Sequence, residues 1–410
     1  MGERHPIIVV GAGIGGLTAA LALAHAGFRV VVVERAVELS EAGAGIQLSP
    51  NAGRVLASLG LDRAIAAKAI EPAAVEVRSS ASGRVLTAIP AATFRERYRF
   101  PYRIIHRADL QMALLAGARA HELITLETGA TITETLKQPD SLLIRIARAG
   151  GTSVMPAGMV IAADGVWSSF REHVTGAARA VPAGMTAWRA AIASDVAREL
   201  APMNRVCVWL GREGHLVHYP IAKGAALNVV AIVPETWDRP GWNTPGDPAE
   251  IAVHFTSWTE AARRLIAAPL AWQKFAITTV DPARAWTEGR VALLGDAAHA
   301  MLPYLAQGAA MAIEDGAVLT EHLRGATDIP AALRAYEADR KPRVAKVVAA
   351  SAATGRHYQA SGMTALARDL ALRLAGAPLI LGRNDWIYHW QPPGLAHPIS
   401  NESSSMTWPR

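Results

Sequence analysis

The apolar positions near the N-terminus form two short β-branched runs with an alanine- and leucine-rich stretch between them. Ile7–Val10 is the first run, Leu17–Ala26 has the composition of a buried helix that Gly27 ends, and Arg29–Val33 is the second run. Glycines interrupt the apolar stretch after the first run, which argues against a membrane span or a signal peptide. The pattern therefore predicts a strand, a helix and a second strand.

The turn after the first predicted strand has the glycine spacing of a dinucleotide-binding loop. Gly11, Gly13 and Gly16 would allow a tight turn, the approach of a pyrophosphate, and close packing of helix on strand, respectively. The phosphates would lie at the helix N-terminus, where free N–H groups favour anions. Glu34 ends the second run, where a carboxylate accepts hydrogen bonds from ribose hydroxyls, and we expect Arg35 beside it in the same cofactor site.

The composition indicates a globular protein and excludes several other classes. Of 410 residues, 51% are hydrophobic and 19% are charged, which is enough apolar material for two or three domains and excludes a disordered chain. Cys207 is the single cysteine, so we expect a reducing, cytoplasmic location and no multi-cysteine metal site. The formal net charge is +6, but without a long run of lysine or arginine it does not predict binding to nucleic acid.

Two further segments indicate which dinucleotide the loop binds. Val160–Arg171 contains the pair Asp164-Gly165 after an apolar run, and Arg290–His299 contains the pair Gly295-Asp296 after another. Together with the glycine loop, they resemble the DG and GD motifs of the single-component (group A) FAD-dependent aromatic hydroxylases. Further segments are similar to the salicylate and hydroxybenzoate hydroxylase branch of that family, so that the resemblance covers nearly the whole chain: Gly43–Ala52, Ile105–Leu110 and Asp385–Tyr388.

This resemblance implies a fold and a domain organisation. The fold is α/β, with a Rossmann-like FAD-binding domain of the glutathione-reductase type in its hydroxylase variant, an interleaved β-sheet substrate domain and a helical C-terminus. The expected FAD-binding domain comprises 1–75, 100–180 and 280–350, the substrate domain comprises 76–99 and 181–279, and 351–410 form a C-terminal helical segment and tail. Three β-like runs would build the substrate sheet: Val206–Leu210, His215–Tyr219 and Leu227–Val233.

The resemblance also implies which residues hold FAD. Asp296 ends a buried run at the carboxyl end of a predicted strand, where a carboxylate can accept hydrogen bonds from ribityl hydroxyls. N–H groups at the start of the next predicted helix would meet the pyrimidine oxygens of the flavin. Asp164 would support the pyrophosphate region, and Arg107 would contact FAD. Besides the glycine loop, Glu34 and Arg35, the expected set is Gly45, Gln47, Arg107, Asp164, Asp296, Gln307, Gly308, Ala309 and Ala310.

The reaction that the resemblance implies has three steps. NADH or NADPH, a transient co-substrate, reduces FAD; O2 then adds to the reduced flavin; and the C4a-hydroperoxide hydroxylates a phenolic aromatic acid such as salicylate or a hydroxybenzoate. Gln47 stands where a pyridine-hydroxylating relative carries histidine, which favours a carbocyclic ring over the alternative, a hydroxypyridine carboxylate. A flavoprotein oxidase or dehydrogenase of the same fold, and a noncatalytic dinucleotide-binding module, remain alternatives. We expect a monomer or a homodimer.

The candidate catalytic residues follow from the need for a base near the phenol. A phenol reacts far better when it is ionised, and histidine suits proton transfer near neutral pH. In a strand, His215 and Tyr219 lie on one face and His218 on the other. The His-x-x-x-Tyr spacing resembles the pair that contacts the phenol in hydroxybenzoate hydroxylases, and this resemblance implies that His215 is the base and that Tyr219 orients the phenol. The alternative is a half-buried structural histidine. The Pro303 carbonyl would help to hold the proton of the hydroperoxide, and Tyr304 would line the substrate ring.

Several arginines allow two interpretations. Arg95, Arg97 and Arg99 alternate, which predicts a basic, solvated edge strand. The alternative is an electrostatic collar that attracts anionic NADH and an acidic substrate. Arg189 follows Trp188, so it is either the residue that binds the substrate carboxylate or a cation–π partner of the tryptophan at the surface.

Overall fold

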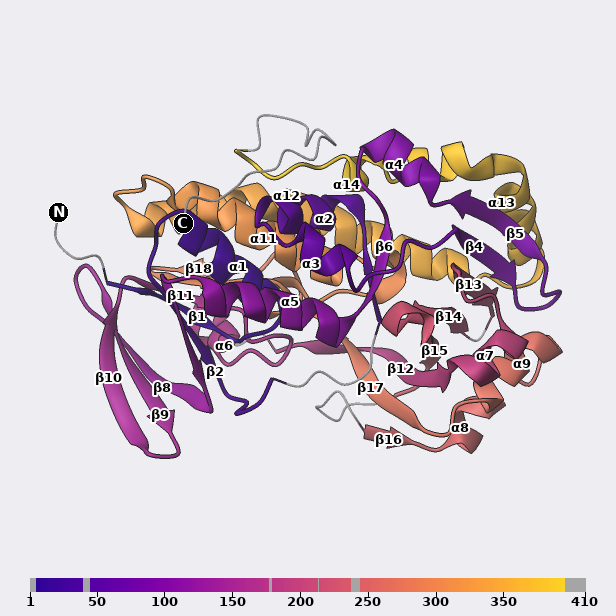
Figure 1. Ribbon diagram of the computed structural model, residues 1–410, viewed down its shortest axis with the longest axis horizontal. Coiled ribbons are helices and arrows are strands. Elements are labelled where there is room, and N and C mark those ends of the chain that lie inside the picture. Colours follow the sequence, from indigo (N-terminus) through magenta and orange to yellow (C-terminus); the bar gives the residue numbers. More distant parts are fainter. Residues whose placement is uncertain (1–4, 40–44, 177–178, 213, 237–243, 395–410) are drawn as a thin grey trace.

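A six-stranded sheet forms one half of the molecule (Figure 1). The computed structural model describes residues 5–39, 45–176, 179–212, 214–236 and 244–394. In spatial order the strands are β18 (Thr287–Glu288), β19 (Val291–Leu293), β11 (Met159–Ala162), β1 (Ile7–Val10), β2 (Val30–Glu34) and β7 (Ile124–Thr128). Neighbours are parallel except for β18 and β19. With α1 (Ile14–His25) between β1 and β2, the predicted βαβ unit is confirmed.

The helices pack closely around this sheet because small residues face one another. α1 lies against α11 (Gly308–Leu323), where a Cβ on Gly316 would be 3.1 Å from the Ala19 backbone. α5 (Arg107–Ala120) packs on α1, and the Gln111 side chain donates to the Ala12 carbonyl, 2.9 Å away. The loop after β1 is thus held from two sides.

An eight-stranded sheet forms the other half and joins two distant parts of the chain. Its spatial order is β16 (Thr244–Gly246), β17 (Trp272–Thr279), β12 (Val181–Ala193), β15 (Ala226–Pro234), β14 (Gly214–Ile221), β13 (Arg205–Gly211), β4 (Ala74–Ser79) and β5 (Val85–Pro90). The three β-like runs predicted between residues 206 and 233 are confirmed as β13, β14 and β15. β4 joins this sheet by parallel pairing with β13. The domain boundaries themselves stay predictions.

The remaining elements connect and cover these sheets. β3 (Gly45–Leu48) pairs with β6 (Arg103–His106), and β8 (Ala130–Lys137), β9 (Leu142–Arg148) and β10 (Gly151–Ala157) form a separate three-stranded sheet. The shorter helices are α2 (Pro50–Ser58), α3 (Asp62–Ala66), α4 (Ala92–Tyr98), α6 (Phe170–Thr175), α7 (Ser194–Leu200), α8 (Pro248–Val253), α9 (Glu260–Ala267), α10 (Asp296–His299), and the 3-10 turns η1 (Ala222–Gly224) and η2 (Pro303–Leu305).

The prediction of a basic edge strand at Arg95, Arg97 and Arg99 is wrong, because Arg95 and Arg97 belong to α4 and Arg99 follows it. Phe94 and Tyr98 lie four residues apart and are buried together, which fixes the helical repeat. The arginines bind separate carboxylates: Arg95 pairs with Glu71 at 2.7 Å and Arg97 with Asp385 at 2.5 Å. The three arginines therefore do not lie along a strand, although they alternate in the sequence.

The C-terminal part is helical, as expected. α12 (Ile329–Tyr358) runs from β18, where Thr287 binds Glu337, to β14, where Tyr358 packs edge-on against His215 (Figure 1). α13 (Gly362–Gly382) covers β5, and α14 (Asp385–Tyr388) follows it. The predicted tail, residues 400–410, lies outside the described residues. None of the helices in the described ranges has the length and apolar character needed to cross a membrane.

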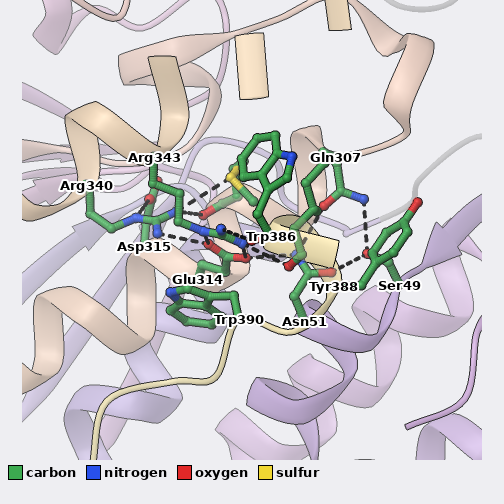
Figure 2. A network of polar contacts seen from close by, with 12 residues as sticks. Ser49, Asn51, Gln307, Glu314, Asp315, Arg340, Arg343, Trp386, Tyr388 and Trp390 are labelled. Carbon is green, nitrogen blue, oxygen red and sulfur yellow. Dashed lines mark hydrogen bonds and ion pairs between the residues drawn. The ribbon is translucent and has the colours of Figure 1, made fainter. Parts of the chain in front are cut away.

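A buried network of charges joins α11 to α12 (Figure 2). The Glu314 carboxylate accepts hydrogen bonds from Arg340 at 2.8 Å and from Arg343 at 2.7 Å. Asp315 accepts from Arg340 at 2.7 Å and contacts His299 at the same distance. Burial raises the pKa of Asp315, but His299 and Arg340 outweigh this and hold it at about 2. Each buried charge is therefore compensated.

The same network attaches the C-terminal segment. Arg343 also donates to the main-chain carbonyls of Trp386 and Ile387, at 2.9 and 3.1 Å. Arg54 on α2 donates to the carbonyls of Tyr388 and Trp390, at 2.7 and 2.8 Å. The segment around α14 is therefore held through its main-chain carbonyls, in addition to the side-chain pair of Arg97 with Asp385.

The Arg340→Met substitution should lower the free energy of unfolding by about 3–5 kcal/mol, because it leaves Glu314 and Asp315 buried without one of their counter-charges. Arg334→Met on the exposed side of the same helix is the matched control, with an expected change within about 0.5 kcal/mol. Urea unfolding in the presence of saturating FAD measures both. Equal stability of the two variants would contradict a stabilising role for the network.

Candidate active site

One cavity lies between the two sheets and is lined by both of them. Its volume is about 360 Å³. Gly13, Gly165 and Asp296, which follow β1, β11 and β19, lie in its lining, and strands β12, β14, β15 and β17 supply the facing wall. Parallel α/β sheets bind ligands beyond the carboxyl ends of their strands, so this cavity is the candidate active site.

The glycine loop after β1 has the shape that a phosphate needs. A Cβ on Gly16 would lie 2.0 Å from the Gly11 carbonyl oxygen, and one on Gly11 would lie 2.6 Å from the Ala163 oxygen. Gly11 also has a φ of +98°, a conformation that favours glycine. A Cβ on Gly13 would meet no atom within 4 Å, because this position faces the cavity. The loop is therefore packed tightly against the protein at Gly11 and Gly16 and is open to the cavity at Gly13.

Glu34 fixes this loop to the end of β2. Its carboxylate accepts hydrogen bonds from the main-chain N–H of Ala12 and of Ala36, both at 2.8 Å. Arg35 is exposed, and neither Glu34 nor Arg35 lies in the cavity lining. A carboxylate has further lone pairs, so these two bonds leave Glu34 able to accept from a sugar hydroxyl.

One buried arginine holds together the two loops that carry the DG and GD motifs. Arg171 on α6 donates to the carbonyls of Val166 and Ala297, at 2.9 and 2.7 Å, and to that of Asp296 at 3.1 Å. Asp164 accepts from the Ser169 N–H at 2.9 Å through one oxygen, and within the described residues its other oxygen is buried without a hydrogen-bond partner. Arg171 therefore ties the two loops together, and Asp164 keeps one buried acceptor without a partner among the described residues.

The start of α11 lies at the same cavity. Gln307 precedes the helix, as predicted, and its amide donates to Ser49 and accepts from Asn51, at 3.0 and 3.1 Å. Gly308 and Ala309 line the cavity. Figure 2 shows that this cluster continues into Glu314 through Asn51, 2.8 Å away. The N–H groups that open α11 are thus oriented by a buried network.

The eight-stranded sheet presents a mostly apolar wall whose rows follow from its strand register. One row runs across four strands from Phe275 through Ala187 and Ile232 to His215. In the next row, Arg189 is opposite Val230, which is opposite Val217. All of these residues line the cavity. His215 and Tyr219 therefore lie on the same face of the sheet, as predicted, and both line the cavity. His218 points to the other face, towards Trp209.

The ring of His215 packs against two tyrosine rings. Its ring is 5.0 Å from that of Tyr304 and 5.5 Å from that of Tyr358, between ring centroids. Burial lowers the pKa of His215 to about 3, so its imidazole is neutral at pH 7. Among the described residues, its buried Nδ1 has no hydrogen-bond partner. Tyr304 lies behind His215 rather than in the cavity lining, and a Cβ on Gly355 would be 2.4 Å from its ring.

Tyr219 connects the two walls of the cavity. A Cβ on Gly45 would lie 2.2 Å from the Tyr219 ring, so the two strands approach closely only because residue 45 is glycine. Burial raises the pKa of Tyr219 well above its usual value, against smaller opposing effects of Arg189 and of a hydrogen bond with Gln47. Tyr102 donates to the Gln47 amide oxygen. Tyr219 is therefore a protonated donor at pH 7.

The charged side chains in the described lining are Arg107, Arg189 and Asp296. The guanidinium of Arg189 lies over the ring of Phe275, 3.9 Å from its centroid. Trp188 instead points to the opposite face and receives Lys274 at 4.8 Å. The expected surface pair of Arg189 with Trp188 is therefore wrong, because neighbours in a strand face opposite sides of the sheet. No cluster suited to a metal ion occurs within the described ranges.

The predicted site residues divide into two groups. The cavity lining brings together Gly13, Gly45, Gln47, Arg107, His215, Tyr219, Asp296, Pro303, Gly308 and Ala309. Outside the lining lie Gly11, Gly16, Glu34, Arg35, Asp164, Tyr304, Gln307 and Ala310. Two features of the site were not predicted from the sequence: the role of Arg171 and the contact of Asn51 with Glu314. Arg171 lies within the DG motif, but no local pattern signals its four main-chain acceptors.

Comparison with known proteins agrees with this geometry. Residues 4–351 match a family model described as an FAD binding domain. The chain is 36% identical to a 3-hydroxybenzoate 6-hydroxylase of Polaromonas naphthalenivorans (strain CJ2), over 94% of this chain and 96% of that protein. It is 39% identical to the 3-amino-4-hydroxybenzoate 2-monooxygenase PtnB3 of Streptomyces platensis, over 87% and 89%.

Among solved structures, Klebsiella pneumoniae HpxO complexed with FAD and uric acid is similar, with a TM-score of 0.81 and 28% identity over 92% of this chain and 95% of that one. The chain therefore belongs to the family of FAD-binding, group A aromatic hydroxylases, which are monooxygenases. The expected α/β fold with a helical C-terminus is likewise confirmed.

The Gly13→Ala substitution should weaken FAD binding by at least tenfold with little change in stability. Its Cβ meets no protein atom but enters the space in front of the loop, where a pyrophosphate would approach. Gly150→Ala, whose Cβ also meets nothing within 4 Å, is the matched control. Fluorescence titration of the apoprotein with FAD measures the affinity. Unchanged affinity in Gly13→Ala would show that the pyrophosphate does not approach this residue.

Proposed function

We propose that this protein is an NAD(P)H-dependent FAD monooxygenase that hydroxylates a phenolic aromatic acid. The observation that carries the proposal is a cavity in which the glycine loop after β1 faces a mostly apolar sheet with a buried, neutral histidine. The two curated relatives compared above carry names that specify phenolic benzoates as substrates, which supports the same class of substrate here.

The residues present fit FAD. The open position in front of Gly13 leaves space for the pyrophosphate. The unpaired carboxylate oxygen of Asp164 is an acceptor, and the N–H groups at the start of α11, from Gly308, are oriented donors. Asp296 would accept from the ribityl hydroxyls, and Arg107, Gly45 and Gln47 would line the opposite side. The bound flavin would take electrons from NAD(P)H and activate O2 for transfer of one oxygen atom to the ring.

His215 would act as the base for the phenol. A neutral imidazole with an unpartnered Nδ1 can accept a hydrogen bond from a phenolic hydroxyl and draw its proton away. This increases the electron density of the ring at the positions ortho and para to the hydroxyl. Because burial lowers the pKa of His215 to about 3, a protonated His215 would be stable only beside a negative charge. The imidazolium and the phenolate would therefore form together, as an ion pair.

Tyr219 and Pro303 would position the reactants. The Tyr219 hydroxyl is a protonated donor that can orient an anionic oxygen. Pro303 begins η2 in the cavity lining and has no N–H, so its main chain offers an acceptor without a competing donor. The surrounding apolar side chains would exclude water from the reaction.

A panel of aromatic acids tests the function. We expect purified holoprotein to oxidise NADH or NADPH faster in the presence of one or more hydroxybenzoates, with O2 uptake and a product 16 mass units heavier than the substrate. If the new hydroxyl replaces the carboxyl group, which leaves as CO2, the product is about 28 mass units lighter. Stimulation by a hydroxypyridine carboxylate alone would select that alternative. Anaerobic reduction of FAD by the organic substrate without NAD(P)H would identify an oxidase or dehydrogenase, and a protein without turnover would be a binding module.

The His215→Ala variant should retain FAD and NAD(P)H oxidation but lose at least tenfold in hydroxylated product, because the phenol is no longer deprotonated. His218→Ala is the matched control, since His218 is on the same strand, equally buried and shifted to the same pKa of about 3, but faces away from the cavity. Coupled product per NAD(P)H consumed is the measurement. Equal product yield from both variants would remove His215 from the catalytic residues.

A further inference from the structure

A closed ring of three hydrogen bonds lies behind the start of α11 (Figure 2). The Ser49 hydroxyl donates to the Asn51 amide oxygen at 2.7 Å, and the Asn51 amide donates to the Gln307 oxygen at 3.1 Å. The Gln307 amide donates back to Ser49 at 3.0 Å. All three side chains are buried. Each member of this hydrogen-bonded ring therefore donates to one neighbour and accepts from the other.

Glu314 sets the direction of the hydrogen-bonded ring. The Asn51 amide also donates to the Glu314 carboxylate at 2.8 Å, and this carboxylate pairs with Arg340 and Arg343. A carboxylate only accepts hydrogen bonds, so the Asn51 amide cannot turn over without placing its oxygen against an oxygen of Glu314. The orientation of Gln307 follows, because its oxygen must face the N–H groups of Asn51. A charge on α11 thus fixes both amides.

The hydrogen-bonded ring also holds a strained residue of the cavity lining. The Gln307 amide lies 3.4 Å from the Leu305 carbonyl and so reaches back across Ala306. Ala306 lines the cavity with a φ of +52°, a left-handed conformation that is unfavourable for a residue with a Cβ. Because α11 begins two residues later, the conformation of Ala306 sets the direction in which the helix starts.

The start of α11 is left without a side-chain cap. Gln307 is the residue that precedes the helix, but within the described residues its side chain makes no hydrogen bond to the helix N–H groups. The N–H groups that open an α-helix have no acceptor inside it, and Gly308 and Ala309 at this point line the cavity. Because the Gln307 amide is engaged elsewhere, these N–H groups stay available to the oxygens of a ligand.

We propose that Asn51 is a positioning residue for FAD, although it does not line the cavity itself. It holds Gln307, and through Gln307 it holds Ala306, so that the opening N–H groups of α11 face the flavin and stabilise negative charge on its reduced form. This inference rests on the proposed function, because it needs a flavin in this cavity. Asn51 then sets how readily the flavin accepts electrons without touching it.

The reduction potential of bound FAD tests this without turnover. The Asn51→Leu substitution removes the amide that donates to Gln307 and Glu314, so the reduced flavin should lose at least tenfold more in binding than the oxidised flavin. A tenfold difference lowers the midpoint potential by about 30 mV. Redox titration of the purified holoprotein against reference dyes, without NAD(P)H or an aromatic acid, measures this. Adding Ala306→Gly should recover part of the shift, because glycine adopts the left-handed conformation without help from Gln307.

Thr320→Val is the matched control, because it removes a buried hydrogen bond from the same helix about 18 Å from its start, and it should leave the potential unchanged. Ser49→Ala breaks the hydrogen-bonded ring but keeps the Glu314 contact, so it should lower the potential by less than Asn51→Leu does. Ser49→Ala carries the test if Asn51→Leu does not hold FAD, and a wild-type potential in Ser49→Ala would then overturn the proposal.

A wild-type potential in Asn51→Leu, or an equal shift in Thr320→Val, would overturn the role of Asn51. A shift that Ala306→Gly leaves unchanged would overturn the route through Ala306. Each of these results leaves the proposed function intact, whereas a wild-type protein that does not bind FAD would contradict the proposed function itself.

Discussion

The whole cavity depends on one buried guanidinium. Arg171 is 2% exposed and donates to main-chain carbonyls of both loops that follow β11 and β19, Gly165 and Asp296 among them. Burial lowers its pKa, the cost of keeping a charge away from water, and carbonyl dipoles compensate it. The segment between β11 and α6 contains no helix or strand, and β19 is followed by the single turn of α10, so this side chain joins the two segments at the point where the sheet meets the cavity.

The features that sequence could predict are those encoded in local patterns. The βαβ unit was predicted from two β-branched runs and the glycines between and after them. The common face of His215 and Tyr219 was predicted from the alternation of side chains along a strand. The alternation of Arg95 and Arg97 suggested a strand as well, but buried aromatic residues four apart decided for a helix. Local patterns therefore succeed where burial and periodicity agree.

Side-chain contacts that depend on the register between strands far apart in the sequence could not be predicted from local patterns. Sequence placed Arg189 beside Trp188, whereas the pairing of β12 with β17 places it over Phe275. Tyr304 adjoins the cavity-lining Pro303 but lies behind His215, since α12 brings Tyr358 and Gly355 to the same place. These contacts link residues far apart in the chain, and no spacing in the sequence reports them.

The position of Gly355 links the packing of α12 to the surroundings of His215. The glycine lies on α12, outside the cavity, and the Tyr304 ring fills the space where its side chain would be. A larger residue there would displace Tyr304, whose ring packs against His215, with every lining residue unchanged. The fit of a substrate ring beside His215 accordingly depends on a residue of α12 that does not itself line the cavity.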